Sequence, residues 1–303
     1  MADTSKPLIG FIGQGWIGKN YSNDLEARGF TVVRYGLEDA YKANKAKIKD
    51  CDIVFIAVPT PTTKKGFDDS YVRSVLPLVG KGKIAVIKST LIIGCTERLQ
   101  KKFKDIIVTH SPEFLSEKTA AYDAAHPDRN IVGIPVNDKK YIEAAELVLS
   151  VLPPAPFSLV CSASEAELIK YSHNVHGYIQ VVFANILYDL AQEFSMDWEV
   201  LFKAFSANPL MVPRYLRPVH QSGRGAGGNC FVKDFEAFIR LFESKVNDKT
   251  GIAALKAIRE KNIQLLVSTG KDIEKIKEMY GHGAIKKHSQ KATKRSSKKL
   301  HKK

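Results

Sequence analysis

Long apolar runs are absent from this sequence of 303 residues. The longest, such as Ile53–Val58, has the length of a strand, whereas a membrane-spanning helix needs about 20 apolar residues. Residues 1–7 are polar and short, and the apolar stretch after them is too brief for a signal peptide. We therefore expect a cytoplasmic protein that has no membrane partner.

Paired cysteines are also absent. The four cysteines, Cys51, Cys95, Cys161 and Cys230, are scattered, with no CxxC pair and no His spacing typical of zinc. This argues against a metal site and fits free thiols in a reducing compartment. At 44% hydrophobic and 26% charged residues, the composition is that of a globular protein, long enough for two domains. There is no internal repeat.

Acidic residues are missing from 285–303, where nine Lys or Arg residues gather. The rest of the chain carries only +5 of the net charge of +14. Because this low-complexity segment cannot bury a core, we expect a disordered basic tail over 281–303. A nonspecific contact with polyanions stays open, since clustered cations bind phosphate backbones.

Short apolar stretches separated by helical stretches fill the first half of the chain. They predict strands at 8–12, 30–34, 52–58, 83–88, 106–109, 131–134 and 157–160. Because they are continuously apolar rather than alternating, they indicate a parallel sheet covered on both faces. We expect an α/β fold, with a Rossmann-like domain over 1–158.

The pattern changes to helical spacing after the proline-rich residues 153–156. It predicts one helix over 164–194, about 45 Å long, opened by a capping box of Ser164 and Glu167. Such a length favours packing against a second copy, as a homodimer. Further helices are predicted over 198–207, 233–244 and 252–280. The domain over 159–280 is therefore expected to be all-α.

The loop Gly13-Gln14-Gly15-Trp16-Ile17-Gly18 follows the first predicted strand and opens a helix, the context in which GxGxxG binds a dinucleotide. In that motif the first glycine makes a tight turn, the second admits the pyrophosphate and the third lets the helix approach the strand. The acid expected after the second strand is absent, although Glu38 or Asp39 could replace it. NAD is the expected cofactor, and Arg34 keeps NADP open because it could meet a 2′-phosphate.

A cysteine follows a second glycine-rich loop in Gly225-Ala226-Gly227-Gly228-Asn229-Cys230-Phe231-Val232-Lys233-Asp234. If a helix starts at Phe231, Cys230 lies at its N-terminus beside Lys233, where the dipole and the ammonium both favour a thiolate. Asp234 faces the same way and could transfer protons. The pattern indicates a nucleophile, and the alternative is a buried structural cysteine.

Two further groups of polar residues could take part in chemistry. Lys170 and Asn174 lie one turn apart on the predicted long helix and could donate to an oxyanion, unless they form an exposed polar face. Glu113, in the segment 111–117, follows a strand end, where open α/β sheets bind ligands. It could act as a general base or only stabilise a helix start.

Several motifs occur in one characteristic order along the chain. They are the loop 13–18, Val58-Pro59-Thr60-Pro61-Thr62, Lys88-Ser89-Thr90, Ser111-Pro112-Glu113-Phe114-Leu115, residues 167–174, and residues 227–234. In these motifs the chain resembles the UDP-glucose/GDP-mannose dehydrogenase family. The resemblance covers nearly everything between residue 8 and about residue 242.

The resemblance implies NAD-dependent oxidation of a nucleotide-sugar C6 alcohol, that of UDP-glucose or a similar sugar, to the carboxylate. Cys230 would attack the aldehyde, and the thiohemiacetal would yield a second hydride and leave a thioester. Lys170 and Asn174 would stabilise charge on oxygen. Glu113 or Asp234 would activate the hydrolytic water, which Thr90 would hold.

The resemblance also implies binding residues. Cofactor contacts would come from the loop 13–18 and from Thr60, Pro61, Thr62, Ser89, Glu117 and Lys233. Sugar contacts would come from Phe114, Leu115, Gln221, Gly225, Gly227 and Arg214, the last reaching the sugar of a neighbouring subunit.

The chain departs from the family at three points. Ala226 stands where an aromatic is usual, Ser116 where Arg or Ala is common, and the family's second Rossmann-like domain, which binds the nucleotide sugar, is not found. Two other functions stay open. One is a β-hydroxyacid-type dehydrogenase, which does not need Cys230, and the other is a noncatalytic cofactor-binding scaffold whose basic tail binds polyanions.

Overall fold

The computed structural model describes residues 6–289, and the chain divides into two compact units. The first unit runs to Pro61 and resumes over Asp68–Lys170, and the second comprises Thr62–Phe67 and the chain from Tyr171 onward. The division therefore falls inside the long helix, after Lys170, whereas the sequence places the domain boundary at residue 158.

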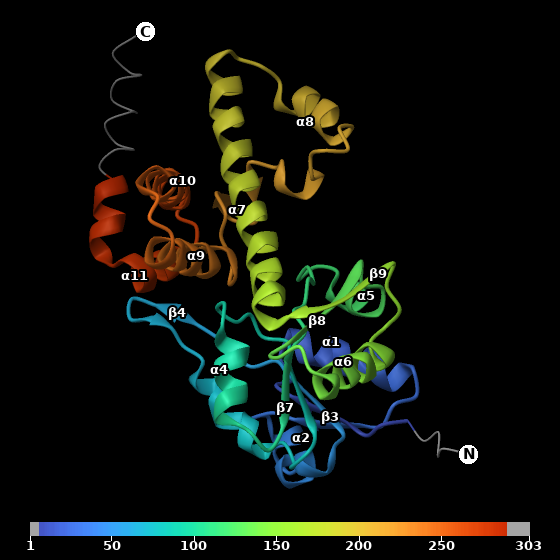
Figure 1. Cartoon of the computed structure of the whole chain (residues 1–303). Coiled ribbons are helices and arrows are strands. Elements are labelled where there is room, and N and C mark those ends of the chain that lie inside the picture. Colours follow the sequence, from blue (N-terminus) through green and yellow to red (C-terminus); the bar gives the residue numbers. More distant parts are fainter. Residues whose placement is uncertain (1–5, 290–303) are drawn as a thin grey trace. The chain divides into compact units, whose positions relative to one another are not determined.

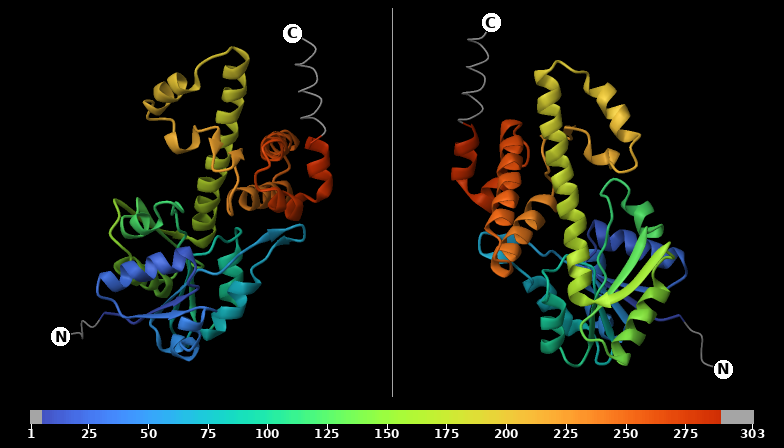
Figure 2. Two further views of the ribbon diagram at one scale, coloured as in Figure 1. Left: turned by 180° about the vertical axis from the view of Figure 1, so that it is seen from behind. Right: turned by 45° about the horizontal axis from the view of Figure 1, so that its top comes forward.

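The first unit is built on a seven-stranded sheet (Figure 1). In spatial order its strands are β2 (Val32–Tyr35), β1 (Ile9–Ile12), β3 (Ile53–Ile56), β6 (Ile84–Ile87), β7 (Ile107–His110), β8 (Arg129–Ile134) and β9 (Phe157–Ser162). Each predicted strand is present. β8 and β9 run side by side, and the chain continues from β9 directly into the long helix (Figure 2).

The prediction of a purely parallel sheet is wrong at one pairing. β8 runs antiparallel to β7, which it meets at His110 and Gly133, and β9 then runs parallel to β8. An antiparallel neighbour needs no full crossover, and only a loop and the short helix α5 (Ala120–Ala125) separate β7 from β8. Continuous apolar sequence does not distinguish a reversed strand from its parallel neighbours.

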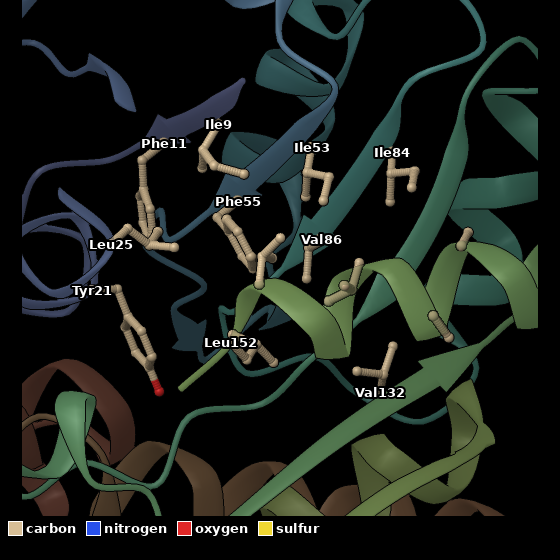
Figure 3. Packing of buried hydrophobic residues seen from close by; sticks show 14 of the residues in the cluster. Ile9, Phe11, Tyr21, Leu25, Ile53, Phe55, Ile84, Val86, Val132 and Leu152 are labelled. Atoms are coloured by element: carbon tan, nitrogen blue, oxygen red, sulfur yellow. The ribbon is translucent and has the colours of Figure 1, made fainter. Parts of the chain in front are cut away.

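Buried side chains cover both faces of this sheet. On one face Phe11, Phe55 and Val86 of the strands pack against Tyr21 and Leu25 of α1 (Trp16–Ala27), as Figure 3 shows. Helix α6 (Lys139–Val151) extends this cluster over β8. Strand residues of opposite orientation, Val54, Ile56, Ala85 and Ile87, are also buried, as the continuously apolar strands predict. The remaining elements are α2 (Asp39–Lys42), η1 (Lys45–Asp50), α3 (Ser70–Val75), η2 (Leu76–Leu78) and α4 (Cys95–Lys102).

The second unit is mainly helical. Its helices are α7 (Ala163–Glu193), which begins in the first unit, α8 (Trp198–Ser206), η3 (Pro213–Tyr215), α9 (Phe231–Lys245), α10 (Lys249–Ser268) and α11 (Ile273–Tyr280). Helices α9, α10 and α11 pack against one another. The unit also contains two small hairpins, and one of them interrupts residues 159–280, where the sequence predicts an all-α domain. These are β4 (Thr62–Thr63) with β5 (Gly66–Phe67), and β10 (Val219–His220) with β11 (Gly223–Arg224).

The capping box of α7 lies two residues earlier than predicted. Ser162 Oγ accepts a hydrogen bond from the Glu165 amide (3.3 Å), and the Glu165 carboxylate accepts one from the Ser162 amide (2.8 Å). Glu167 is instead buried and accepts from the amides of Gly94 (2.6 Å) and Thr96 (2.8 Å). Both serines stand three residues before a glutamate, so the spacing alone could not distinguish them.

The predicted helix over 252–280 is two helices, α10 and α11. Gly270 (φ 72°) and Asp272 (φ 51°) adopt left-handed backbone between them, which ends α10. The expected disordered tail is wrong over residues 282–289, which are helical because Ala284 and Ile285 pack against apolar residues of α9–α11. The rest of the predicted tail, and its polyanion contact, lie outside the described residues. Over 6–289, no helix combines the length and the apolar character needed to cross a membrane.

Candidate active site

The first glycine-rich loop, residues 13–18, has the conformation that the motif predicts. Gly13 is left-handed (φ 91°), and a Cβ there would overlap the carbonyl oxygen of Ala57. A Cβ on Gly18 would overlap the carbonyl oxygen of Gly13. At Gly15 a Cβ would meet no atom within 4 Å. The protein's own backbone therefore requires Gly13 and Gly18, whereas Gly15 leaves open space at the N-terminus of α1, where an anion is favoured.

The surroundings of this loop fit a dinucleotide. Gln14 is buried and donates to Phe11 O (3.2 Å), but its Oε1 has no hydrogen-bond partner among the residues that the structure describes. Trp16 is 38% exposed, and Ile17 packs on the core. An open α1 N-terminus beside an unsatisfied buried acceptor is a suitable place for a ligand that carries phosphates and hydroxyl groups.

The end of β2 carries both groups that bear on the choice of cofactor. Arg34 pairs with Glu26 of α1 (2.5 Å) and donates to Asn23 (2.8 Å), so its guanidinium is already engaged. The Glu38 carboxylate lies against Gly36, where a Cβ would overlap it, and the same Cβ would stand 3.5 Å from Gln14 Cβ. A carboxylate thus occupies the position after the second strand where the sequence motif lacks an acid.

Hydroxyl groups tie the ends of β3 and β6 together. Ser89 Oγ donates to Val58 O (2.7 Å) and accepts from the Val58 amide (3.0 Å). Thr60 donates to Thr90 O (2.8 Å) and is followed by Pro61, the last residue of this part of the first unit. These hydrogen bonds make Ser89 and Thr60 structural supports of the sheet edge. Glu117, the other predicted cofactor residue near this edge, is exposed.

Glu113 and Lys170, for which the sequence predicts separate roles, form one buried ion pair. Lys170 Nζ lies 2.9 Å from Glu113 Oε1 and donates to the Glu113 carbonyl oxygen (2.6 Å), with side chains 4% and 6% exposed. Glu113 Oε2 accepts from the amide of Leu115 (2.8 Å). The ring of Phe114 lies 5.5 Å from Lys170 Nζ. The carboxylate is therefore held by an ammonium and an amide, as an ionised group requires when it is buried.

Lys88 is a functional candidate that the sequence reasoning missed. It is buried at the end of β6, donates to Ser111 Oγ (3.2 Å), and lies 4.4 Å from the centre of the Tyr21 ring. Burial lowers the pKa of Lys88 to about 7; Glu113 opposes this and Lys170 adds to it. A lysine directly after a continuously apolar strand was the available signal, because its side chain starts from a buried position.

In the second unit, a group of polar side chains lies at the start of α9. This helix begins at Phe231, so Cys230 is its N-cap residue and is partly buried. Asp234, 1% exposed in its side chain, accepts from Asn174 Nδ2 (2.6 Å) and from Lys233 Nζ (2.6 Å). The structure thus brings four predicted residues together around the first turn of one helix.

The predicted sugar residues lie in different kinds of backbone. Arg214 is exposed in the turn η3, and Gln221 is exposed with left-handed backbone (φ 55°) between β10 and β11. Gly225 (φ 91°) is buried, and a Cβ on Gly227 would overlap the carboxylate of Asp272. Ala226, which replaces the usual aromatic, is buried in the apolar cluster of α7 and α9.

The predicted site residues belong to both units. Thr90, Glu113, Phe114, Leu115, Glu117 and Lys170 lie in the first unit with the loop 13–18, Thr60, Pro61 and Ser89. Thr62, Asn174, Arg214, Gln221, Gly225, Gly227, Cys230, Lys233 and Asp234 lie in the second. Within the first unit Glu113 is bonded to Lys170, and within the second Asp234 is bonded to Asn174 and Lys233.

Comparisons with known proteins agree with these observations. The NAD-binding domain of the UDP-glucose/GDP-mannose dehydrogenase family matches residues 37–150, and its central domain matches residues 164–264. A putative UDP-glucose 6-dehydrogenase from Bacillus subtilis is 28% identical over 250 residues, which cover 78% of this chain and 56% of that protein. A UDP-glucose 6-dehydrogenase from Pseudomonas aeruginosa is 30% identical, over 73% of this chain and 51% of that protein.

A solved structure shares the architecture. A UDP-glucose dehydrogenase from the archaeon Pyrobaculum islandicum superimposes with a TM-score of 0.73 at 25% identity, covering 88% of this chain and 71% of that one. The chain spans about half the length of the curated relatives it matches. With two consecutive domains matched in order, the chain belongs to the UDP-glucose/GDP-mannose dehydrogenase family.

Proposed function

We propose that this protein oxidises the C6 alcohol of a nucleotide sugar, UDP-glucose or a close relative, to the carboxylate with Cys230 as the nucleophile. The observation that carries the proposal is the start of α9, where Cys230 is the N-cap residue and Asp234 is held by Lys233 and Asn174. A helix N-terminus and a nearby ammonium both stabilise a thiolate. A purely structural cysteine would not require a hydrogen-bonded group of Lys233, Asp234 and Asn174 at the start of the same helix.

Bound NAD would supply the hydride acceptor for both oxidation steps. In the first, the alcohol loses its proton and a hydride, and an aldehyde forms. Lys170 and Asn174 would stabilise the negative charge that develops on the sugar oxygen. Glu113 orients Lys170 through their 2.9 Å ion pair, so this carboxylate would act on the first step by fixing the position of its donor.

The second oxidation needs a nucleophile to add to the aldehyde first, because the carbonyl carbon can lose hydride only from a tetrahedral intermediate. The Cys230 thiolate would add to the carbonyl carbon and form a thiohemiacetal. Loss of a hydride from that carbon leaves a thioester, which water cleaves to the carboxylate and the free thiol. Asp234 or Glu113 would accept a proton from this water, and Thr90 would hold the water in place.

The cofactor is proposed to be NAD rather than NADP. The Glu38 carboxylate beside Gly36 would accept from ribose hydroxyls and repel a 2′-phosphate. Arg34, the candidate for binding that phosphate, is engaged by Glu26 and Asn23. Titration with each cofactor tests this: tighter binding of NADP than of NAD would overturn the assignment.

Reaction stoichiometry tests the main proposal. With UDP-glucose and NAD, two NADH per sugar and a glucuronate product are expected. One NADH per sugar would indicate a simple alcohol dehydrogenase, such as the β-hydroxyacid type, and none a noncatalytic scaffold. Cys230→Ser should abolish acid formation while NAD still binds, whereas Cys161→Ser, another partly buried thiol, should behave as wild type. Unchanged acid formation by Cys230→Ser would exclude the thioester.

A homodimer through α7 is part of the proposal. Phe183, Ile186, Leu190 and Phe194 recur at helical spacing and are 48–66% exposed. A contiguous apolar stripe of this kind is typical of a surface that another molecule covers. The mass in solution tests this: wild type should be dimeric, and Phe183→Glu with Leu190→Glu should be monomeric. A monomeric wild type would refute the assignment.

A further inference from the structure

We infer that Lys271 and Asp272, in the turn between α10 and α11, are positioning residues that hold the glycine-rich loop 220–228. Neither residue belongs to the predicted site, and both come more than forty positions after the loop. The hydrogen bonds from Lys271 and Asp272 to the loop are seen in the structure, and their effect on catalysis rests on the proposed function of Cys230.

Lys271 binds the loop through its ammonium group. Its side chain is buried, and its ammonium donates to the carbonyl oxygens of His220 (3.1 Å), Gly223 (3.4 Å) and Gly225 (3.0 Å). Burial lowers the pKa of Lys271, with the Asp272 carboxylate opposing that shift. An ammonium has three N–H donors, so three converging carbonyl groups satisfy it completely.

Asp272 holds the end of the loop that leads to the thiol. Its carboxylate accepts from the Gly228 amide (2.8 Å) and from Lys275 Nζ (2.8 Å). A Cβ on Gly227 would overlap this carboxylate, so the loop backbone lies directly against it. Asp272 itself has left-handed backbone (φ 51°, ψ 33°), a conformation that Asp tolerates and most residues avoid.

Two other side chains complete the attachment. Asn262 of α10 accepts from the Ala226 amide (2.7 Å) and donates to the Ala226 carbonyl oxygen (2.9 Å). Thr269 Oγ accepts from the Arg224 amide (3.0 Å). Residues 223–228 are therefore bound mainly by polar side chains from one later segment, whereas the loop's own ladder is only the short pair β10–β11.

The attachment determines where the chain enters α9. Gly228 lies two residues before Cys230, so fixing its amide restricts the direction of the Cys230 side chain and of the first turn of α9. The same loop contains Gln221, Gly225 and Gly227, the predicted sugar contacts. A site residue displaced by about 1 Å can lose 100-fold in rate, so a loop held from outside needs such anchors.

The test measures the loop directly by hydrogen exchange of peptides within 221–229, a readout that does not depend on activity. In Lys271→Ala these amides should exchange roughly tenfold faster than in wild type, because charge-assisted hydrogen bonds are lost. Propylammonium, which can enter the space left by the lysine, should restore protection. Tetramethylammonium at the same ionic strength has no N–H donor and should not.

Two further variants keep the inference falsifiable if Lys271→Ala does not fold. Asp272→Gly preserves the left-handed backbone but removes the acceptor of the Gly228 amide, and it should also accelerate exchange about tenfold. Lys277→Ala, at a nearby lysine whose side chain is 40% exposed and pairs with Glu274, is the control and should match wild type. Wild-type exchange in both Lys271→Ala and Asp272→Gly, or equal rescue of Lys271→Ala by both ammonium ions, would overturn the inference.

Activity measurements then separate the inference from the proposed function. In Lys271→Ala, kcat for acid formation should fall at least tenfold with NAD affinity unchanged, and propylammonium should restore it. A wild-type protein without turnover would refute the proposed function, and the exchange experiment would still decide the role of Lys271 and Asp272. Faster exchange with unchanged kcat would refute only the positioning of Cys230.

Discussion

The two glycine-rich loops of this protein reach a defined shape by opposite means. The loop 13–18 is closed by its own backbone, because Gly18 lies against the carbonyl of Gly13, which lies against that of Ala57. The loop 220–228 is attached by side chains from a later segment, namely those of Asn262, Lys271 and Asp272. In the first loop, glycine is therefore needed where two backbone segments touch. In the second, it is needed for left-handed backbone and where a side chain such as that of Asp272 lies against the loop.

The difference bears on where each loop is vulnerable. A substitution can break the first loop only at the loop itself or at the strand beneath it. The second can be broken from α10 and the following turn, at positions that touch no predicted ligand. Residues far from Cys230 in sequence thus control the backbone that leads to it.

The largest effect is expected at Gly18. Gly18→Ala would force a methyl group into the Gly13 carbonyl, and it should lower the free energy of unfolding by about 3 kcal/mol and abolish NAD binding. Gly15→Ala is the matched control, because Gly15 has φ −65° and open space around its Cβ position. Urea denaturation should show a loss below about 1 kcal/mol for Gly15→Ala, although NAD affinity falls. Equal destabilisation by both would contradict a self-closed loop.

The next largest effect is expected at Asn262, whose side-chain amide holds Ala226 of the second loop and also forms a hydrogen bond with Tyr178. Asn262→Ala leaves the buried amide and carbonyl of Ala226 without partners and should cost about 2 to 3 kcal/mol. Asn262→Asp keeps the acceptor but places a carboxylate against the Ala226 carbonyl, so it should not restore stability. Ser268→Ala, at an exposed position of the same helix, should be near neutral. An Asn262→Asp variant as stable as wild type would show that the donor is dispensable.

The first loop could be predicted from sequence and the second only in part, for a physical reason. Gly13, Gly15 and Gly18 act within six residues of one another, and the strand before them and the helix after them have their own periodic patterns. The anchors of the second loop join positions 36 to 51 residues apart, and nothing local marks Asn262 or Lys271 as loop contacts.

The candidate site shows the same limit. The sequence predicts Lys170 and Asn174 as a pair of donors and Glu113 and Asp234 as candidate bases, but it does not predict which donor binds which carboxylate. Glu113 is bonded to Lys170 and Asn174 to Asp234 across 57 and 60 positions. The reversed β8 and the break in the helix after Ser268 were missed likewise, because strand direction and left-handed turns leave weak local signals.

The two units also differ in how they satisfy a buried lysine, Lys88 in the first and Lys271 in the second. Lys271 is satisfied by three carbonyl groups, whereas Lys88 donates to Ser111 Oγ and lies over the ring of Tyr21. The pKa of Lys88 in the folded protein is about 7, below the ordinary value of 10.5. Between these values the unfolded state binds more protons, so stability should rise with pH in this window.

Removing the amine tests that contrast. From pH 7 to pH 9 the free energy of unfolding of wild type should increase by about 1 to 2 kcal/mol relative to Lys88→Met, which cannot titrate. Urea denaturation at a series of pH values measures the difference. Parallel curves for the two proteins would show that Lys88 keeps its proton, and hence that Glu113 compensates fully for burial.

The smallest effect is expected at Gly270, in the turn that carries the anchors of the second loop. Gly270 has φ 72° and open space at its Cβ position, so Gly270→Ala introduces strain without overlap and should cost about 1 kcal/mol. Gly270→Asn should cost less, because Asn adopts left-handed backbone more readily. Exchange of the loop amides should rise slightly in the alanine variant only. If both variants equal wild type in stability and in exchange, the turn accepts a side chain at residue 270 without moving Lys271 or Asp272. The left-handed conformation of Gly270 would then not contribute to holding the loop.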